Sequence, residues 1–204
     1  GVCRDMVLSI YLEEHCEIPL PPDTVFSMPV IYQKLDKQRR ALAALDTTFI
    51  HFDCLGDSLT YYNKANGQTQ PITTNDFFRY LHKQYPGKAI YLDIYGTWCT
   101  PCMEEMKHAP TLYERYAGQD IVFVDLCCKS SRDSWLKVAR RLDCEHYLIT
   151  GKLCERFQYE CSLLGYPTYM LLDRNGRFLT RRAPRPSERN KLFPLLDSIL
   201  QPNH

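Results

Sequence analysis

The strongest constraint on the fold is the segment Trp98-Cys99-Thr100-Pro101-Cys102, together with the residues on either side of it. It follows directly on the apolar run 89–95 and leads into residues 103–108, whose composition is compatible with a helix. We therefore expect a strand, a short turn and a helix that begins near Cys99. Pro101 fits the first turn of that helix, because its missing N–H group and its fixed φ angle are tolerated there.

Two cysteines with this spacing at a helix start predict redox chemistry. The unpaired backbone N–H groups at the start of the helix favour a thiolate on Cys99, and the thiolate is the attacking species. Cys102, one turn further on, can attack a mixed disulfide on Cys99 and release the product. We therefore predict a thiol-disulfide oxidoreductase whose catalytic pair is Cys99 and Cys102, with Thr100 and Pro101 as the active-site loop between them.

Asp93 is a carboxyl group in an otherwise apolar strand. Its neighbours on both sides, Tyr91-Leu92 and Ile94-Tyr95, leave no clear polar face. We therefore expect the Asp93 carboxyl to be partly buried, with a raised pKa, and to accept the proton of Cys102 when that sulfur attacks. The alternative is an edge strand on which Asp93 points to solvent.

Two later segments predict a turn, a strand and a hairpin. Residues 164–173 fit a turn followed by a strand, with Pro167 near the start, where donation to the strand ladder is not required. Residues 173–177 fit a hairpin turn that leads into residues 178–180.

Taken together, these segments resemble the thioredoxin superfamily and, within it, the TlpA-like group of bacterial envelope thiol-disulfide oxidoreductases. The resemblance covers about residues 48–200 and rests on three motifs in the family's order: Gly96-Thr97-Trp98-Cys99-Thr100-Pro101-Cys102, Gly165-Tyr166-Pro167-Thr168 and Asp173-Arg174-Asn175-Gly176. One departure is Pro110, which stands eight residues beyond Cys102, later than the family's kink proline usually comes.

The resemblance implies roles for residues outside the cysteine pair. It implies a cis Tyr166-Pro167 bond whose loop faces the active-site disulfide, so that Tyr166, Pro167 and Thr168 contact the substrate. Trp98 adds a flat apolar surface beside the sulfurs and is expected to bind substrate with them. Asp93 takes the position of the buried acid of thioredoxin.

We expect an α/β, thioredoxin-like fold: a central mixed β-sheet flanked by helices, with an added N-terminal helical segment and a hairpin. Residues 1–47 are expected to form the N-terminal helical extension and residues 48–204 the thioredoxin-like domain. In the extension, helices are predicted over 2–16 and 30–45. Before the motif strand, we expect a hairpin with strands over 58–62 and 69–73, followed by a helix over 76–84 that Thr74 or Asn75 caps. After the motif helix, we expect a strand over 120–126 and a helix from Ser131 to residue 142. Residues 146–150 and a helix over 152–161 together are expected to form an insertion, and the final helix is expected over 187–200.

Composition limits the partners. The net charge of +1 gives no electrostatic reason to expect nucleic acid or an anionic membrane surface as a partner. No apolar stretch approaches the length needed to span a bilayer, and a start at Gly1 indicates a trimmed chain. The resemblance implies protein thiols or disulfides as substrates, an upstream redox donor or acceptor protein, and a location facing the periplasm, with a possible anchor outside this sequence.

The chain has ten cysteines, a high number for its length. Apart from the redox pair, most are expected to be small buried apolar residues. Cys127 and Cys128 are expected on opposite sides of a strand, and Cys154 and Cys161 are two helical turns apart, so neither pair is expected to form a disulfide. We expect no cofactor and no metal: Cys144-Glu145-His146 is the only candidate for a zinc ligand pair, and a zinc site would need a second one.

Two alternatives belong to other classes of function. A non-catalytic binding module with the same fold would not need both cysteines, Pro101, Pro167 and Asp93. A peroxiredoxin-like peroxidase would not need two cysteines at this spacing. We therefore favour thiol-disulfide exchange over both.

Overall fold

The computed structural model describes residues 4–5, 8, 21–37, 59–74 and 76–201. The chain divides into two compact units, Gly1–Phe49 and Ile50–His204. Most of the helix predicted over 2–16, and residues 38–45 of the second predicted helix, lie outside the described residues.

In the first unit, a short 3-10 helix η1 (Asp23–Val25) precedes a helical stretch over residues 29–37. Phe26 and Leu35 are buried, with partly buried apolar neighbours at Leu8, Ile31 and Tyr32. The backbone N–H of Met28 donates to Asp5 Oδ2 at 2.8 Å, which ties the start of this stretch to the N-terminal residues.

The second unit is built around one sheet of seven strands in the order β2-β1-β5-β4-β3-β6-β7. Its central strands β3, β4 and β5 are parallel, and the outer pairs are antiparallel. The predicted mixed sheet and both predicted hairpins are therefore confirmed. The strands are β1 (Leu59–Asn63), β2 (Gln68–Pro71), β3 (Ala89–Tyr95), β4 (Ile121–Cys128), β5 (Glu145–Ile149), β6 (Thr168–Leu172) and β7 (Phe178–Thr180).

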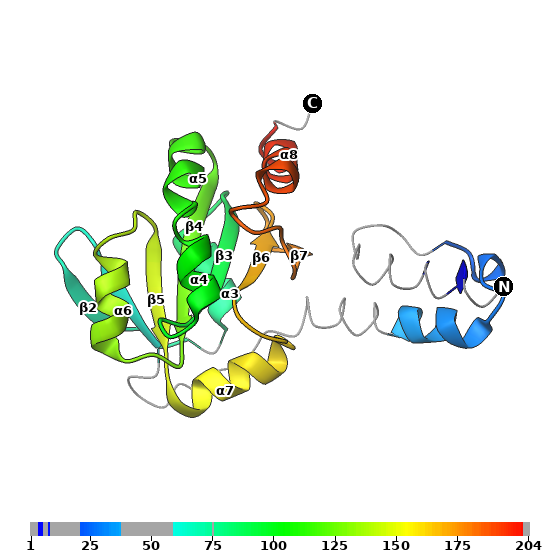
Figure 1. The fold of residues 1–204 in the computed structure, drawn as a ribbon, viewed down its shortest axis with the longest axis horizontal. Helices are drawn as coiled ribbons and strands as arrows, with labels where there is room; N and C mark the ends of the chain where they lie inside the picture. The colour runs from blue at the N-terminus through cyan, green and yellow to red at the C-terminus, as the bar shows by residue number, and fades with distance from the viewer. Residues whose placement is uncertain (1–3, 6–7, 9–20, 38–58, 75, 202–204) are drawn as a thin grey trace. The chain divides into compact units, whose positions relative to one another are not determined.

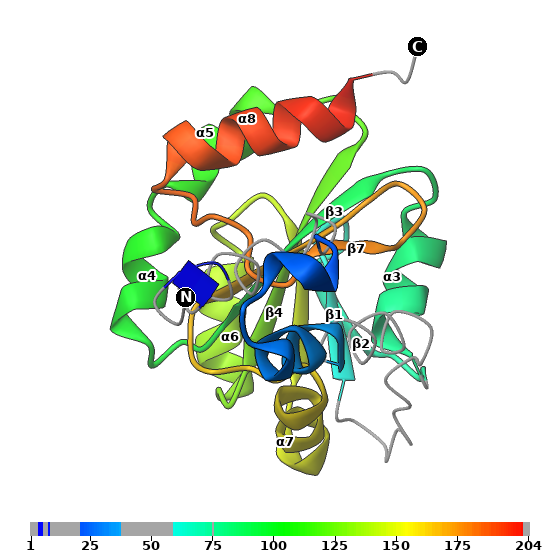
Figure 2. The ribbon, with the colours of Figure 1, turned by 90° about the vertical axis from the view of Figure 1, so that its right-hand side faces the viewer.

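Helices cover both faces of the sheet (Figures 1 and 2). One face packs against α3 (Phe77–Gln84) and α7 (Gly151–Glu160), whose apolar residues share a cluster with β3 and β4. The other face carries two clusters, to which the remaining helices contribute. These helices are α4 (Thr100–Glu105), α5 (Ala109–Arg115), α6 (Arg132–Ala139) and α8 (Arg189–Leu200).

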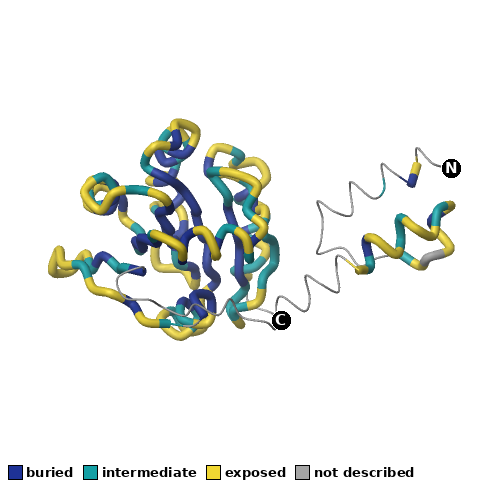
Figure 3. Tube along the Cα trace, turned by 90° about the horizontal axis from the view of Figure 1, so that it is seen from below, coloured by how far each residue is buried: buried dark blue, intermediate teal, exposed yellow. Residues whose placement is uncertain are grey.

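Strand β3 lies in the middle of this core, and all seven of its residues are buried. In the second unit as a whole, buried stretches gather in the interior and exposed ones lie around them (Figure 3). Because side chains alternate along a strand, Ile90, Leu92 and Ile94 point to the face of α3 and α7, and they belong to that cluster. Tyr91 and Tyr95 belong to the two clusters on the opposite face. The cysteine segment follows the C-terminal end of β3 and continues into α4, on the same side of the sheet as Tyr91 and Tyr95.

Three details differ from the sequence-based expectations. Asp76, and not Thr74 or Asn75, caps α3: its carboxylate accepts the N–H of Arg79 at 3.0 Å, whereas Thr74 Oγ1 accepts the N–H of Asp76. Residues 145–149 are not an insertion but the strand β5, which pairs with both β1 and β4. Helix α6 ends at Ala139, three residues earlier than expected.

Candidate active site

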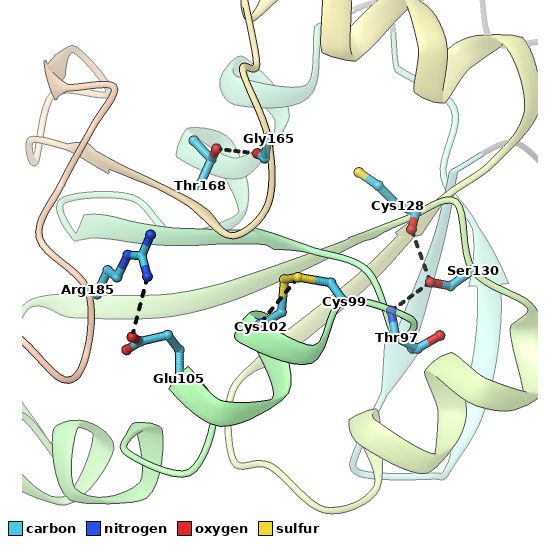
Figure 4. Close-up of a disulfide and its surroundings, with 9 residues drawn as sticks. All are labelled: Thr97, Cys99, Cys102, Glu105, Cys128, Ser130, Gly165, Thr168 and Arg185. Carbon is cyan, nitrogen blue, oxygen red and sulfur yellow. Dashed lines mark hydrogen bonds and ion pairs between the residues drawn. A yellow bond between two sulfur atoms is a disulfide. The ribbon is translucent and has the colours of Figure 1, made fainter.

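The two cysteines of the motif form a disulfide at the C-terminal end of β3 (Figure 4). Cys99 is the N-cap residue of α4, and the backbone N–H of Cys102 donates to Cys99 Sγ at 3.2 Å. Cys99 keeps 5% of its surface exposed, whereas Cys102 has none. The local sequence explains this helix start, because Pro101 lies in the first turn of α4, where a proline has no N–H that would be left without a partner.

Helix α4 is shorter than the sequence predicts. It ends at Glu105, and a turn joins it to α5, which has Pro110 in its first turn. Pro110 therefore starts a new helix instead of kinking a continuous one. The Glu105 carboxylate accepts the N–H of Ser187 at 3.1 Å and its hydroxyl at 2.9 Å, and it lies 3.8 Å from Arg185. These contacts hold the end of α4 against the segment before α8 (Figure 4).

Trp98 is a large aromatic side chain beside the disulfide that stays 56% exposed. Its ring meets the ring of Tyr166 edge to face, with centroids 5.5 Å apart. The indole also lies directly over Gly96, where an added Cβ would come within 2.7 Å of it. Glycine at position 96 is therefore what allows Trp98 to lie in this place.

The loop before β6 forms the other side of the site. The Tyr166-Pro167 peptide bond is cis. The Tyr166 ring packs against the apolar cluster that contains both Cys99 and Cys102. The hydroxyl of Thr168 donates to the carbonyl of Gly165 at 2.8 Å and closes the loop (Figure 4). The structure thus brings this loop, from a later part of the chain, to the segment that holds Trp98 and the cysteine pair.

Ser130 is a residue that the sequence analysis did not identify. Its Oγ accepts the N–H of Thr97 at 2.9 Å and donates to the carbonyl of Cys128 at 3.0 Å (Figure 4). It follows β4, which runs parallel to β3, so the ends of both strands meet at one edge of the sheet. A polar residue directly after a parallel strand next to the motif strand is the signal that could have identified it.

Asp93 is buried, with 7% of its surface exposed. Burial raises its pKa well above the ordinary value, and the negative charge of Asp125 adds to the shift. Asp93 lies opposite Asp125 on β4 and opposite Tyr169 on β6 in the sheet register. It shares its face with Tyr95, which packs in one cluster with Cys99 and Cys102.

A third thiol, Cys127, packs in the same cluster as the disulfide. Burial raises its pKa to about 11, so it stays protonated near neutral pH. Cys128, Cys154 and Cys161 are also free and buried, which confirms that the pairs Cys127–Cys128 and Cys154–Cys161 are not disulfides. Cys3, Cys16 and Cys54 lie outside the described residues.

Comparison with known protein families finds that the segment holding this site is similar to thioredoxin-like proteins. A family model described as thioredoxin-like matches residues 87–178, a range that holds the cysteine pair and the cis-proline loop. The curated relatives include thiol-disulfide oxidoreductases named ResA. The one from Geobacillus kaustophilus is 29% identical over 115 residues, and the one from Bacillus thuringiensis subsp. konkukian is 25% identical over 97 residues.

These matches cover only part of the relatives. They span 55% and 48% of this chain, and 66% and 56% of the Geobacillus and Bacillus proteins respectively. A solved structure of a candidate thiol-disulfide oxidoreductase from Bacteroides vulgatus is 27% identical and has a TM-score of 0.52, with coverage of 73% of this chain and 93% of that one. The thioredoxin domain of another Bacteroides vulgatus protein has a TM-score of 0.53 at 12% identity, which supports the fold alone.

Residues 87–178 are therefore similar to the thioredoxin-like family, and the chain has distant homology to thiol-disulfide oxidoreductases named ResA. The α/β thioredoxin-like fold expected from the sequence is confirmed. Among the helices that the structure describes, none has both the length and the apolar character needed to cross a membrane.

Proposed function

We propose that this protein is a thiol-disulfide oxidoreductase that exchanges disulfides with protein substrates through Cys99 and Cys102. The observation that carries the proposal is the Cys99–Cys102 disulfide at the start of α4, next in the chain to exposed Trp98, whose ring contacts Tyr166 of the cis-proline loop. The homology to proteins named thiol-disulfide oxidoreductases supports the same chemistry.

In the reducing direction, the dithiol form begins the reaction. The Cys99 thiolate attacks one sulfur of a substrate disulfide, and the other substrate sulfur leaves as a thiolate that takes a proton from solvent. Cys102 then loses its proton and attacks Cys99 Sγ, which releases the second substrate sulfur. Two electrons pass to the substrate, and the Cys99–Cys102 disulfide remains. The reverse sequence oxidises a substrate dithiol, and a redox partner protein restores the starting form.

The assignment of Cys99 as nucleophile is supported by its surroundings. It retains exposed surface where Cys102 has none, and its sulfur accepts the backbone N–H of Cys102. A backbone N–H donated to sulfur favours the thiolate, which is the form that attacks. Thr100 and Pro101 hold the two sulfurs at the spacing that the second step needs.

Substrate binding is assigned to the surface beside the sulfurs. Trp98 offers exposed apolar area, and its edge-to-face contact with Tyr166 joins it to the cis-proline loop. An extended peptide can pair with the free backbone groups of such a loop. We assign contacts with the substrate backbone to Tyr166, Pro167 and Thr168.

Asp93 is assigned as the proton acceptor for Cys102. It lies on the sheet face that α4 covers, and its Oδ1 atom accepts no hydrogen bond from the described residues. A buried carboxyl group that retains affinity for protons near neutral pH is a suitable base for a thiol. The proton passes directly or through one water.

The resemblance to the TlpA-like group supports a location in the bacterial cell envelope, facing the periplasm. Disulfide exchange with other proteins is suited to that oxidising compartment. Lipid or membrane anchoring in the full-length protein belongs to the same proposal.

An insulin-reduction assay with dithiothreitol, run beside a peroxide-consumption assay, tests the proposal. The wild-type protein is expected to accelerate insulin precipitation, and Cys99→Ser and Cys102→Ser are expected to abolish the acceleration. Cys161→Ala is the matched control, because Cys161 is a free cysteine of another cluster. Failure of the wild-type protein in both assays would support the binding module, and peroxide consumption without insulin reduction would support the peroxidase.

A further inference from the structure

A row of buried titratable side chains crosses the sheet on the face that carries α4, α5, α6 and α8. In the strand register, Asp93 on β3 lies opposite Asp125 on β4, and Asp125 lies opposite His146 on β5. Residues in register on neighbouring strands point to the same face, so the three side chains are neighbours. Their exposed fractions are 7%, 2% and 0%, respectively. Asp93 is therefore one member of a buried group of three.

Two neighbouring carboxyl groups in a buried site do not ionise independently. Each negative charge disfavours the other, so one carboxyl keeps its proton over a range of pH in which the other is charged. Burial and the charge of Asp125 raise the pKa of Asp93 well above its ordinary value. Burial also raises the pKa of Asp125, but the charge of His146 and a hydrogen bond from Cys144 oppose that shift. These surroundings place the negative charge on Asp125 and the proton on Asp93.

The contacts of His146 explain why the two carboxyl groups are unequal. Its Nδ1 lies 3.4 Å from Asp125 Oδ2, and β5 lies on the side of β4 away from β3. Its Nε2 lies 3.2 Å from the carbonyl oxygen of Leu142 and 3.4 Å from Cys144 Sγ. Both ring nitrogens therefore face acceptors, and only the imidazolium form donates from both. A positive ring beside Asp125, and not beside Asp93, favours the charge on Asp125.

Asp125 is the charge with the largest effect on Asp93 among the groups that the structure describes around it. Glu105, at the end of α4, has a smaller effect; it accepts the hydroxyl of Ser187 and lies 3.8 Å from Arg185. The remaining titratable groups that face the two aspartates are phenols and thiols. Burial raises the pKa of each, so they are uncharged near neutral pH: Tyr91, Tyr95, Tyr113, Tyr169, Cys127 and Cys144.

We propose that Asp125 and His146 are positioning residues for disulfide exchange: they hold a negative charge beside Asp93 and so set the pH at which Asp93 can take the proton of Cys102. Asp93 must first lose the proton that it holds at rest. Its carboxylate then accepts the Cys102 proton, and the Cys102 thiolate attacks Cys99 Sγ. This inference rests on the proposed function, in which Asp93 is the base.

A carbon-13 NMR titration of the aspartate carboxyl groups tests the charge distribution without any turnover. The Cys99–Cys102 disulfide of the full chain is kept oxidised, so that neither of those sulfurs titrates. In the wild-type protein, Asp125 is expected to ionise at a lower pH than Asp93. In Asp125→Asn, Asp93 is expected to ionise at a lower pH than in the wild type, because the neighbouring charge is gone.

The same change is expected in His146→Gln, since Asp125 without its positive partner keeps its proton and leaves the charge to Asp93. Asp143→Asn is the matched control. It removes one carboxylate from a side chain that is 91% exposed, so it is expected to leave the Asp93 titration unchanged.

The rate of mixed-disulfide release shows whether the effect reaches the exchange reaction. Asp125→Asn is expected to release the substrate about threefold faster or more at about pH 6, which corresponds to a midpoint about half a pH unit lower. At higher pH, where Asp93 is ionised in both proteins, its rate is expected to equal the wild-type rate or fall below it. A purely structural role of Asp125 would instead slow release at every pH.

Two results would overturn the proposal. One is wild-type protein in which Asp93 ionises at the same pH as Asp125 or at a lower one. The other is an Asp93 titration that is unchanged in Asp125→Asn. The first measurement uses only wild-type protein, so it decides the question even where a variant fails to fold. Wild-type protein without exchange activity would overturn the proposed function, and the titration would still decide where the charge lies.

Discussion

At the scale of single residues, Asp93 stands out because a carboxyl group lies in a fully buried strand. Burial and the nearby charge of Asp125 both disfavour its ionised form. The same environment that makes this carboxylate unfavourable for folding makes it a competent base. Its role in exchange and its effect on stability can therefore be measured separately with one substitution.

Asp93→Asn is expected to slow the second step of exchange, in which Cys102 displaces the substrate from Cys99. The amide keeps the shape of the side chain but cannot accept the thiol proton. Stopped-flow kinetics of mixed-disulfide release between about pH 6 and 8 measure this step. An unaltered rate over that range would mean that Asp93 has only a structural role.

The same variant is expected to be more stable than the wild type as the pH rises. An unfolded Asp loses its proton near pH 3.9, whereas folded Asp93 keeps its proton to higher pH, so the native wild type binds more protons in that interval. Wild-type stability therefore falls with rising pH by at most about 1.4 kcal/mol per pH unit from this group. Urea unfolding of both proteins from pH 4 to 7 checks this, and a constant difference would contradict it.

Local sequence was sufficient to predict some residues and not others. The placement of Cys99 and Cys102 at a helix start and of Asp93 in a buried strand could be predicted, because a strand, a turn and a helix start are encoded within one short segment. Ser130 could not be predicted in the same way, because its contact with Thr97 depends on how β4 pairs with β3. The type of a residue determines which chemistry its side chain can perform. Which residues from different strands come into contact depends on the strand register, and the sequence of one segment does not reveal that register.

At the scale of elements, the substrate side of the site depends on how two loops meet. Trp98 follows β3 and Tyr166 precedes β6, two strands that pair antiparallel. Their aromatic rings meet edge to face with centroids 5.5 Å apart, and the Trp98 indole lies over the backbone of Gly96. The position of Trp98 is therefore set by the absence of a side chain at residue 96.

Gly96→Ala is expected to move Trp98 and to reduce insulin-reduction activity several-fold. A Cβ within 2.7 Å of the indole forces the Trp98 side chain to shift, and because that side chain is exposed and can move into solvent, the cost in stability is expected to stay below about 1 kcal/mol. In a Trp98→Ala background the clash is absent, so adding Gly96→Ala should have little further effect on stability or activity. Equal effects in both backgrounds, measured as a double-mutant cycle, would disprove the packing explanation.

Element types were predicted better than element ends and neighbours. Alternating apolar residues and turn residues identified the strands, but the cap of α3 depends on which of three adjacent polar side chains reaches the N–H of Arg79. The sequence alone predicts residues 146–150 as part of an insertion, because nothing in that segment reveals that β1 and β4 lie on either side of it. Long-range pairing is the information that a single sequence lacks.

At the scale of the whole molecule, all the proposed site residues belong to the unit Ile50–His204. The sheet, both helix layers and the cis-proline loop also lie in this unit. The domain boundary predicted from the sequence at residue 48 can therefore be tested by asking whether residues 48–204 fold and act without residues 1–47.

A fragment of residues 48–204 is expected to fold and to keep insulin-reduction activity within about twofold of the full chain, as expected for a domain with its own core. Circular dichroism and the insulin assay measure these two properties. A folded fragment without activity would indicate that residues 1–47 contribute to catalysis or substrate binding.

The central claim is that Cys99 attacks the substrate and Cys102 resolves the product, and trapping of the mixed disulfide tests it most directly. Cys102→Ser and Cys99→Ser, each in the reduced state, are incubated with a disulfide-bonded protein substrate, and the adducts are mapped by mass spectrometry. We predict a stable adduct through Cys99 in the Cys102→Ser protein and little adduct in the Cys99→Ser protein. A predominant adduct through Cys102, or no adduct in either variant, would contradict the account.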